Sequence, residues 1–235
     1  MRHLLILLFI IPFISHAQTF QSGSTRTELV ELFSSEGCSS CPPADHWLTS
    51  LKSDPKLFKD YIPVAFHVDY WDYIGWKDRF ATAEFTQRQR QYAVEGRISQ
   101  MYTPEFVVNS EEWQQWFHGD RIIEPSSVKA GELTATLDKD LLNVSFSGLK
   151  KEDTILHVAY LGMGLESKVS AGENNNRTLK HDFVALNHFQ IPGQSQWHIA
   201  MPERPNVGQK QTALVIWISP KGSQRVLQSV GGYLL

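Results

Sequence analysis

The alternation of apolar and polar positions predicts strands and helices in turn along the first half of the chain. Residues 28–33 are mostly apolar, as expected of a strand buried on both faces. Residues 44–51 then carry apolar side chains at helical spacing. A second buried strand is predicted at residues 61–68, a polar helix at 82–93 and a short strand at 105–109. We expect an α/β unit in which the first two strands are parallel.

The pattern changes in the second half, where short alternating runs are separated by turn residues from about Gly131 onward. Seven strands are predicted, at residues 133–137, 142–146, 155–161, 178–186, 197–201, 213–218 and 225–230. Strands at this spacing are typical of an antiparallel sandwich. We expect a domain boundary near Pro125, with one domain over residues 18–125 and a second over residues 126–235. Residues 109–125 are compatible with either a helix or a hairpin.

The first 17 residues have the features of a secretory signal peptide. Arg2-His3 precedes an apolar block at residues 4–14, and Ser15-His16-Ala17 ends it with a small-x-small pattern. The block is shorter than the roughly 20 residues that a helix needs to cross a bilayer. We expect cleavage before Gln18 and a periplasmic or secreted protein without a membrane anchor.

The net charge of the chain limits the classes of molecule that it is expected to bind. The formal net charge is −3 at pH 7, and loss of Arg2 with the signal peptide makes it one unit more negative. No long block of like charges appears, so there is no electrostatic case for binding nucleic acid or an anionic membrane. We expect proteins or small molecules as partners.

The chain contains two cysteines, Cys38 and Cys41, spaced as Cys-x-x-Cys. An exported protein can keep a structural disulfide. In the chain-entropy model, however, a bridge that closes so short a loop contributes roughly 2 kcal/mol, against nearly 5 kcal/mol for a loop of about 100 residues. So small a stabilisation favours a redox-active cysteine pair over a disulfide whose role is to stabilise the fold.

The cysteine pair falls on the turn between the first predicted strand and the first predicted helix. Free N–H groups at a helix N-terminus stabilise a thiolate. We expect Ser39 or Ser40 to cap this helix, and the two prolines after the pair to occupy its first turn. Cys38 is therefore predicted to be the attacking thiol and Cys41 the resolving thiol.

Three stretches are distinctive: residues 31–45 (ELFSSEGCSSCPPAD), residues 67–78 (HVDYWDYIGWKD) and Tyr102-Thr103-Pro104. Together they resemble a bacterial exported thioredoxin-like family that is catalogued as a domain of unknown function. The resemblance implies a thioredoxin-like fold, without a settled activity. It also implies a cis bond between Thr103 and Pro104 that faces the cysteines and leaves the Thr103 backbone free to pair with an extended substrate.

The sequence departs from ordinary thioredoxins around the cysteines. Those proteins carry a tryptophan before the first cysteine and usually Gly-Pro between the two, whereas this chain has Gly37 and Ser39-Ser40. These positions influence the redox potential, so the direction of electron transfer stays open.

The loop after the second strand allows three interpretations. In the first, which is structural, its aromatic residues pack as a lid, Asp69 caps a turn, and Asp78 pairs with Lys77 or Arg79. In the second, Asp69 or His67 is a general base that helps the resolving thiol attack a mixed disulfide.

In the third interpretation, His67 joins Cys38 and Cys41 as a ligand of a copper ion, since thiolates and imidazole suit copper. The histidines of the second half have no metal-binding spacing and are interpreted as packing or surface residues: His157, His181, His188 and His198.

These observations predict an α/β thioredoxin-like N-terminal domain followed by an all-β antiparallel sandwich-like C-terminal domain. The function expected is exchange of disulfides with protein thiols or disulfides and an unidentified redox partner, without a cofactor. A copper-binding or metallochaperone-type module and a non-enzymatic interaction scaffold are the alternatives. The candidate catalytic residues are Cys38, Cys41, Thr103, Pro104 and Asp69.

Overall fold

The computed structural model describes residues 17–148, 154–193 and 196–235. The predicted signal peptide lies outside these ranges except for Ala17. None of the helices in the described ranges has the length and apolar character needed to cross a membrane. The elements of the first half are β1 (Gln18–Gln21), β2 (Glu28–Ser34), α1 (Pro42–Ser50), η1 (Leu51–Ser53), β3 (Tyr61–His67), η2 (Asp69–Ile74), α2 (Ala83–Val94), β4 (Glu105–Val108), β5 (Glu111–Glu112) and η3 (Gln114–His118).

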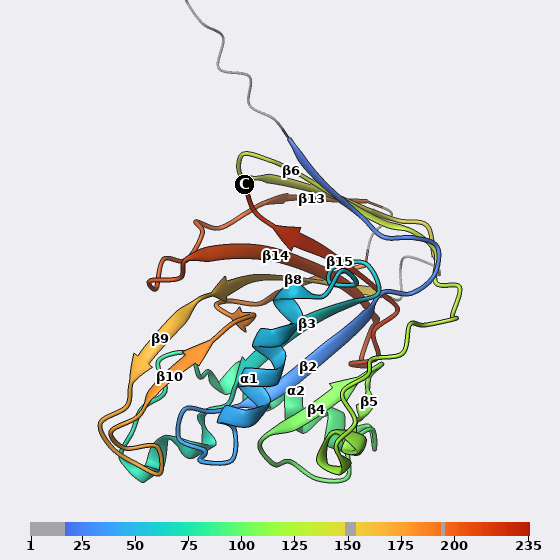
Figure 1. The fold of residues 1–235 in the computed structure, drawn as a ribbon. Coiled ribbons are helices and arrows are strands. Elements are labelled where there is room, and N and C mark those ends of the chain that lie inside the picture. The colour runs from blue at the N-terminus through green and yellow to red at the C-terminus, as the bar shows by residue number, and fades with distance from the viewer. Residues whose placement is uncertain (1–16, 149–153, 194–195) are drawn as a thin grey trace, which may run out of the picture.

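Two parallel strands, β2 and β3, form the centre of this half. Every residue of both strands is buried, and Glu28 lies opposite Tyr61 in the register. Because their side chains point to both faces of the sheet, both faces need a cover. α1 buries Trp47 and Leu48, and α2 buries Phe85. Figure 1 shows α1 in front of these strands and α2 behind them.

The described elements of the second half are all strands. They are β6 (Leu133–Asp138), β7 (Leu141–Phe146), β8 (Thr154–Met163), β9 (Leu165–Lys168), β10 (Thr178–His181), β11 (Val184–Ala185), β12 (Phe189–Pro192), β13 (Gln196–Ala200), β14 (Gln211–Pro220) and β15 (Gln228–Tyr233). β14 is buried on both faces: Leu214 and Ile216 pack in a core with β6 and β7, while Val215 and Trp217 pack in the core of the α/β unit.

The large sheet runs across the boundary that the sequence predicts near residue 125. Its strands lie in the order β15-β14-β8-β11-β3-β2-β4-β5, with β12 also paired to β8. β11 joins the two halves, because Val184 pairs in parallel with Ala65 of β3 and antiparallel with Gly162 of β8. A second sheet, β1-β6-β7-β13, covers the outer face of β8 and β14 (Figure 1).

The predicted elements of the first half are confirmed, with boundaries that differ by one or two residues. Residues 109–125, which were compatible with two structures, begin with a hairpin: Asn109 and Ser110 form the turn between β4 and β5 with φ of 57° and 62°. The predicted strand at residues 178–186 is divided into β10 and β11. Three short strands were not predicted, namely β1, β9 and β12.

Candidate functional site

The cysteine pair lies on the connection between β2 and α1, as predicted. Cys38 and Cys41 form a disulfide with a Cα–Cα distance of 5.5 Å. Both residues are 0% exposed. The chain turns tightly here, since the Cys38 N–H donates to the Ser35 carbonyl and the Cys41 N–H to the Cys38 carbonyl.

The cap of α1 differs from the prediction. Cys41, and neither Ser39 nor Ser40, is the N-cap residue, and no side chain caps the helix. Prolines at the first two helical positions supply no N–H groups. The prediction of a serine cap is therefore wrong, whereas the two prolines occupy the first turn as expected.

Thr103 and Pro104 are joined by a cis peptide bond, as the resemblance implied. The Ser40 hydroxyl lies 3.3 Å from Cys38 Sγ and 3.5 Å from the Thr103 carbonyl oxygen, so it links the cysteine turn to this loop. The indole N–H of Trp71 donates to Thr103 Oγ1 at 2.8 Å. These contacts bring Cys38, Cys41, Thr103 and Pro104 into one site.

Trp71 also explains the glycine that precedes the first cysteine. A Cβ on Gly37 would lie 2.9 Å from Trp71 Cβ and 3.3 Å from Ile74 Cδ1. Only glycine allows η2 to approach the cysteine turn this closely. At the other side of η2, Tyr73 is 83% exposed.

A cluster of buried charged side chains lies behind the cysteine turn. His67 Nδ1 and Asp78 Oδ2 are 2.6 Å apart, and both side chains are fully buried. Asp78 Oδ2 also accepts the Glu36 backbone N–H at 2.9 Å. Burial would raise the pKa of Asp78, but the His67 charge and these hydrogen bonds lower it below its ordinary value.

His181, from β10 in the second half, completes this cluster. Its Nε2 lies 3.4 Å from Glu36 Oε1 and its Nδ1 lies 3.4 Å from Asp45 Oδ2. Burial disfavours the charged imidazole, but the contacts with Asp45 and Glu36 outweigh burial and raise the pKa of His181 to about 10. The pKa of Glu36 is lowered although burial opposes this, mainly by its contact with His181. The cluster therefore contains an imidazolium between two carboxylates.

Asp69, the predicted general base, is engaged elsewhere. Its Oδ1 accepts the Thr86 hydroxyl at 2.5 Å, and its backbone N–H donates to the same hydroxyl oxygen at 3.1 Å. This arrangement ties η2 to α2, and the side chain of Asp69 does not cap η2. Asp69 has no contact with the cysteines among the interactions found in the described residues.

One other expectation about this loop is wrong in detail. Asp78 pairs with His67 rather than with Lys77 or Arg79, because Arg79 donates to the Val207 and Glu166 carbonyls. The Nδ1 atom of His67 is directed to Asp78. No group of three or more His, Cys, Asp or Glu side chains in the described part of the chain is arranged to hold a metal ion.

The residues of the second half that contact the cysteine turn were not predicted from the sequence. Glu173 Oε2 accepts the Ser39 N–H at 3.0 Å, and Asn174 donates to the carbonyls of Glu36 and Cys38. His181 was interpreted as a packing residue. Its only sequence signal was a histidine inside a predicted strand, which does not identify its partners.

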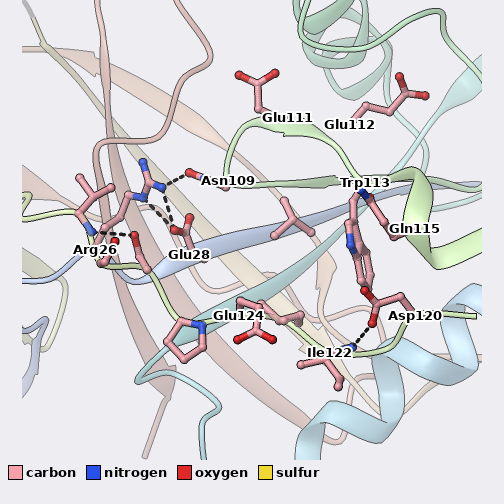
Figure 2. Close-up of a pocket in the computed structure, with 16 residues that line it drawn as sticks. Arg26, Glu28, Asn109, Glu111, Glu112, Trp113, Gln115, Asp120, Ile122 and Glu124 are labelled. Carbon is pink, nitrogen blue, oxygen red and sulfur yellow. Dashed lines mark hydrogen bonds and ion pairs between the residues drawn. The ribbon is translucent and has the colours of Figure 1, made fainter.

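A pocket of about 520 Å³ lies apart from the cysteine pair, between the β4–β5 hairpin and residues 120–128. Figure 2 shows acidic side chains around it, with Arg26 paired to Glu28 and Asn109. Neither cysteine lines this pocket.

Comparisons with known proteins identify the family. A crystal structure of protein AGR_C_4864 from Agrobacterium tumefaciens is similar over 91% of this chain and 96% of that chain, with a TM-score of 0.62 and 21% identity. HBP35 of Porphyromonas gingivalis is similar over 91% of this chain and 76% of that chain, with a TM-score of 0.51 and 9% identity. No curated protein matches. The model of the family described as "Protein of unknown function (DUF1223)" matches residues 29–219, and the chain therefore belongs to this family.

Proposed function

We propose that residues 18–125 form a thioredoxin-like unit and that the protein is an exported thiol–disulfide oxidoreductase acting on protein substrates in the periplasm or outside the cell. One observation carries the proposal: the Cys38–Cys41 disulfide lies at a strand-to-helix turn, and Ser40 links it to the Thr103 carbonyl. A short-loop disulfide contributes little to stability, so its placement beside the Thr103 backbone, which the family resemblance implies is free to pair with an extended substrate, favours exchange.

The chemistry is two successive thiol–disulfide exchanges. When the protein oxidises a substrate, a substrate thiolate attacks Cys38 Sγ, the Cys38–Cys41 bond breaks, and the Cys41 thiolate leaves. A second substrate thiolate then attacks the substrate sulfur of the mixed disulfide and releases Cys38 as a thiolate. The reverse sequence reduces a substrate disulfide, with Cys38 attacking and Cys41 resolving.

Ser40 is the side chain best placed to assist at Cys38. Its hydroxyl lies 3.3 Å from Cys38 Sγ and can donate to that sulfur when it becomes a thiolate. This donor matters because Pro42 and Pro43 remove two N–H groups that a helix N-terminus usually offers.

The test is trapping of the mixed disulfide. Cys41→Ser should accumulate a covalent adduct with a reduced, unfolded model protein after activation of Cys38 with an aromatic disulfide, whereas Cys38→Ala should form none. The wild-type pair should have a redox potential between about −270 and −120 mV. Exchange activity that survives in Cys38→Ala would exclude the proposal.

A second candidate is a static disulfide in an interaction scaffold. It is favoured by one observation, the complete burial of both cysteines. A static bond should have a potential below about −300 mV and resist glutathione. The measured potential therefore separates the two candidates.

A further inference from the structure

We propose that the β9–β10 loop, residues 169–177, is a clamp on the cysteine turn, and that Glu173 lowers the redox potential of the Cys38–Cys41 pair. This inference deepens the proposed function, because it assigns regulation to the same pair. It concerns a part of the chain that is distant from the cysteines in sequence, since Ser39 and Glu173 are 134 residues apart.

Asn174 is the anchor of the clamp. It is fully buried, and its Nδ2 donates to the Glu36 carbonyl at 2.9 Å and to the Cys38 carbonyl at 3.0 Å. Its Oδ1 accepts from Arg177 Nη1 at 2.7 Å, which fixes the orientation of the amide. One side chain of the second half thus holds the backbone on both sides of Gly37.

Glu173 places a negative charge at the backbone of Ser39, the residue after the first cysteine. Its Oε2 accepts the N–H of Ser39, the residue that follows Cys38, at 3.0 Å. The hydrogen bonds from Ser39 lower the pKa of Glu173, so the group is a carboxylate at neutral pH. The Ser39 N–H is the type of donor that would otherwise be available to a Cys38 thiolate.

The clamp packs closely against η2. A Cβ on Gly172 would lie 2.9 Å from Ile74 Cδ1, and Gly172 has a φ of +71° that favours glycine. In Figure 1 the loop that connects β9 and β10 lies beside the segment that precedes α1, in agreement with these contacts. The loop therefore contacts both the cysteine turn and η2.

Reduction of the disulfide creates a negative charge on Cys38, and this explains how Glu173 lowers the redox potential. The disulfide takes up two electrons and one proton to give a Cys38 thiolate and a Cys41 thiol, and the second proton binds at low pH. The Glu173 carboxylate repels the thiolate and occupies its neighbouring donor. It therefore favours the oxidised form, in which Cys38 carries no charge.

Glu173→Gln separates charge from hydrogen bonding, since the glutamine oxygen can still accept the Ser39 N–H. Wild type and variant are equilibrated in dithiothreitol buffers, where the dithiol supplies the two electrons and becomes the cyclic disulfide. The ratio of reduced to oxidised protein should rise about two- to fivefold in Glu173→Gln at low salt, as for an exposed charge pair. The difference should shrink in 1 M salt, where screening is stronger.

Glu166→Gln is the matched control, because it removes an exposed carboxylate of the same hairpin. An unchanged ratio in Glu173→Gln, or an equal change in Glu166→Gln, would overturn the role of Glu173. The ratio is measured at equilibrium with a small dithiol, so this result does not depend on exchange with protein substrates. Failure of the clamp is thus distinct from failure of the proposed function.

Asn174→Ala tests whether the clamp limits reduction of the disulfide. Loss of two buried hydrogen bonds should make reduction by dithiothreitol roughly tenfold faster. Circular dichroism and the unfolding midpoint report whether the variant keeps its fold. A folded Asn174→Ala with the wild-type reduction rate would contradict the clamp. Should the variant unfold, the Glu173→Gln ratio decides the proposal.

Discussion

The protein contains two pairs of buried histidines whose electrostatic environments are opposite. In the first pair, His67 and His181 are perpendicular, with ring centroids 5.0 Å apart, and carboxylates surround them. In the second, His157 Nδ1 lies 3.0 Å from His188 Nε2, and both rings are parallel to the indole of Trp217. Burial is similar in the two pairs, so their neighbours determine the difference.

The neighbours give opposite pKa shifts. Burial and the positive charge of Arg88 lower the pKa of His157 well below its ordinary value. Burial also lowers the pKa of His188, although Glu84 partly opposes this. His181, between Glu36 and Asp45, has its pKa raised to about 10. A buried histidine is thus neutral by default, and two carboxylates are enough to make it a stable cation.

The second pair belongs to a continuous hydrogen-bonded chain. With neutral rings, the Ser219 hydroxyl donates to His157 Nε2, His157 Nδ1–H donates to His188 Nε2, and His188 Nδ1–H donates to Glu84. Each ring then has one donor and one acceptor in use. The chain borders a pocket of about 260 Å³.

The largest effect expected from this comparison is on stability. His181→Leu should lower the free energy of unfolding by about 3–5 kcal/mol, because it leaves Glu36 and Asp45 buried without their cation. His157→Leu removes only neutral hydrogen bonds and should cost about 1–3 kcal/mol. Urea unfolding at pH 7 measures both values. Equal losses would show that the two pairs are not electrostatically different.

The pH dependence of stability should have opposite signs at the two pairs. The raised pKa of His181 adds stability that is complete below about pH 6.5 and is lost as the pH rises through about 10, about 5 kcal/mol at most. The lowered pKa of His157 adds stability above about pH 6.5 that is lost as the pH falls.

Urea midpoints of His181→Gln and His157→Gln between pH 4 and 10 test these signs. His181→Gln should flatten the alkaline side of the wild-type profile, and His157→Gln the acidic side. A His181→Gln profile that is parallel to wild type above pH 7 would refute the imidazolium.

Glu105 resembles His157 and His188 in that burial favours its uncharged form. It is fully buried, its Oε2 accepts from Gln89 Nε2 at 2.6 Å, and burial raises its pKa to about 8. The contribution of Glu105 to the free energy of unfolding is complete below about pH 4.5 and is lost as the pH rises through about 8. Glu105→Gln should therefore match wild type at pH 5 and be more stable by about 2–3 kcal/mol at pH 9. A pH-independent difference would mean that Glu105 is ionised in the fold.

Glu84→Gln should have the smallest effect. The Glu84 side chain is 51% exposed, so its contact with His188 Nδ1 at 2.8 Å is partly screened by solvent. We expect a loss of less than about 1 kcal/mol in the free energy of unfolding. The titration of His188 by NMR should shift to lower pH in the variant. A loss as large as that in His181→Leu would show that Glu84 holds a charged histidine.

The sequence predicted the parts of the site that depend on local pattern. The buried strand, the Cys-x-x-Cys turn, the helix with two initial prolines and the Thr103-Pro104 loop all lie within residues 28–110. Hydrophobic periodicity and turn residues predicted the strand, the cysteine turn and the helix, whereas the place of the Thr103-Pro104 loop beside the cysteines was implied by the family resemblance.

Contacts that depend on the second half could not be predicted. Val184 reaches Ala65, and His181 reaches Glu36, through pairings with no local signature. The helix cap was wrong for a local reason: the helix begins after Cys41, and Pro42 and Pro43 at its first two positions have no N–H groups to donate to a serine side chain. Alternation identifies a buried position without identifying what is buried against it.

The burial of β14 on both faces has a consequence for how the molecule unfolds. One face of this strand is shared with the α/β core and the other with the sandwich core, so neither core can melt without exposing the other. The two halves should therefore behave as a single cooperative unit, with one calorimetric transition. After a proteolytic cut near residue 125, the two fragments should remain associated. A chain ending at residue 125 would lack β11, the strand that pairs with β3.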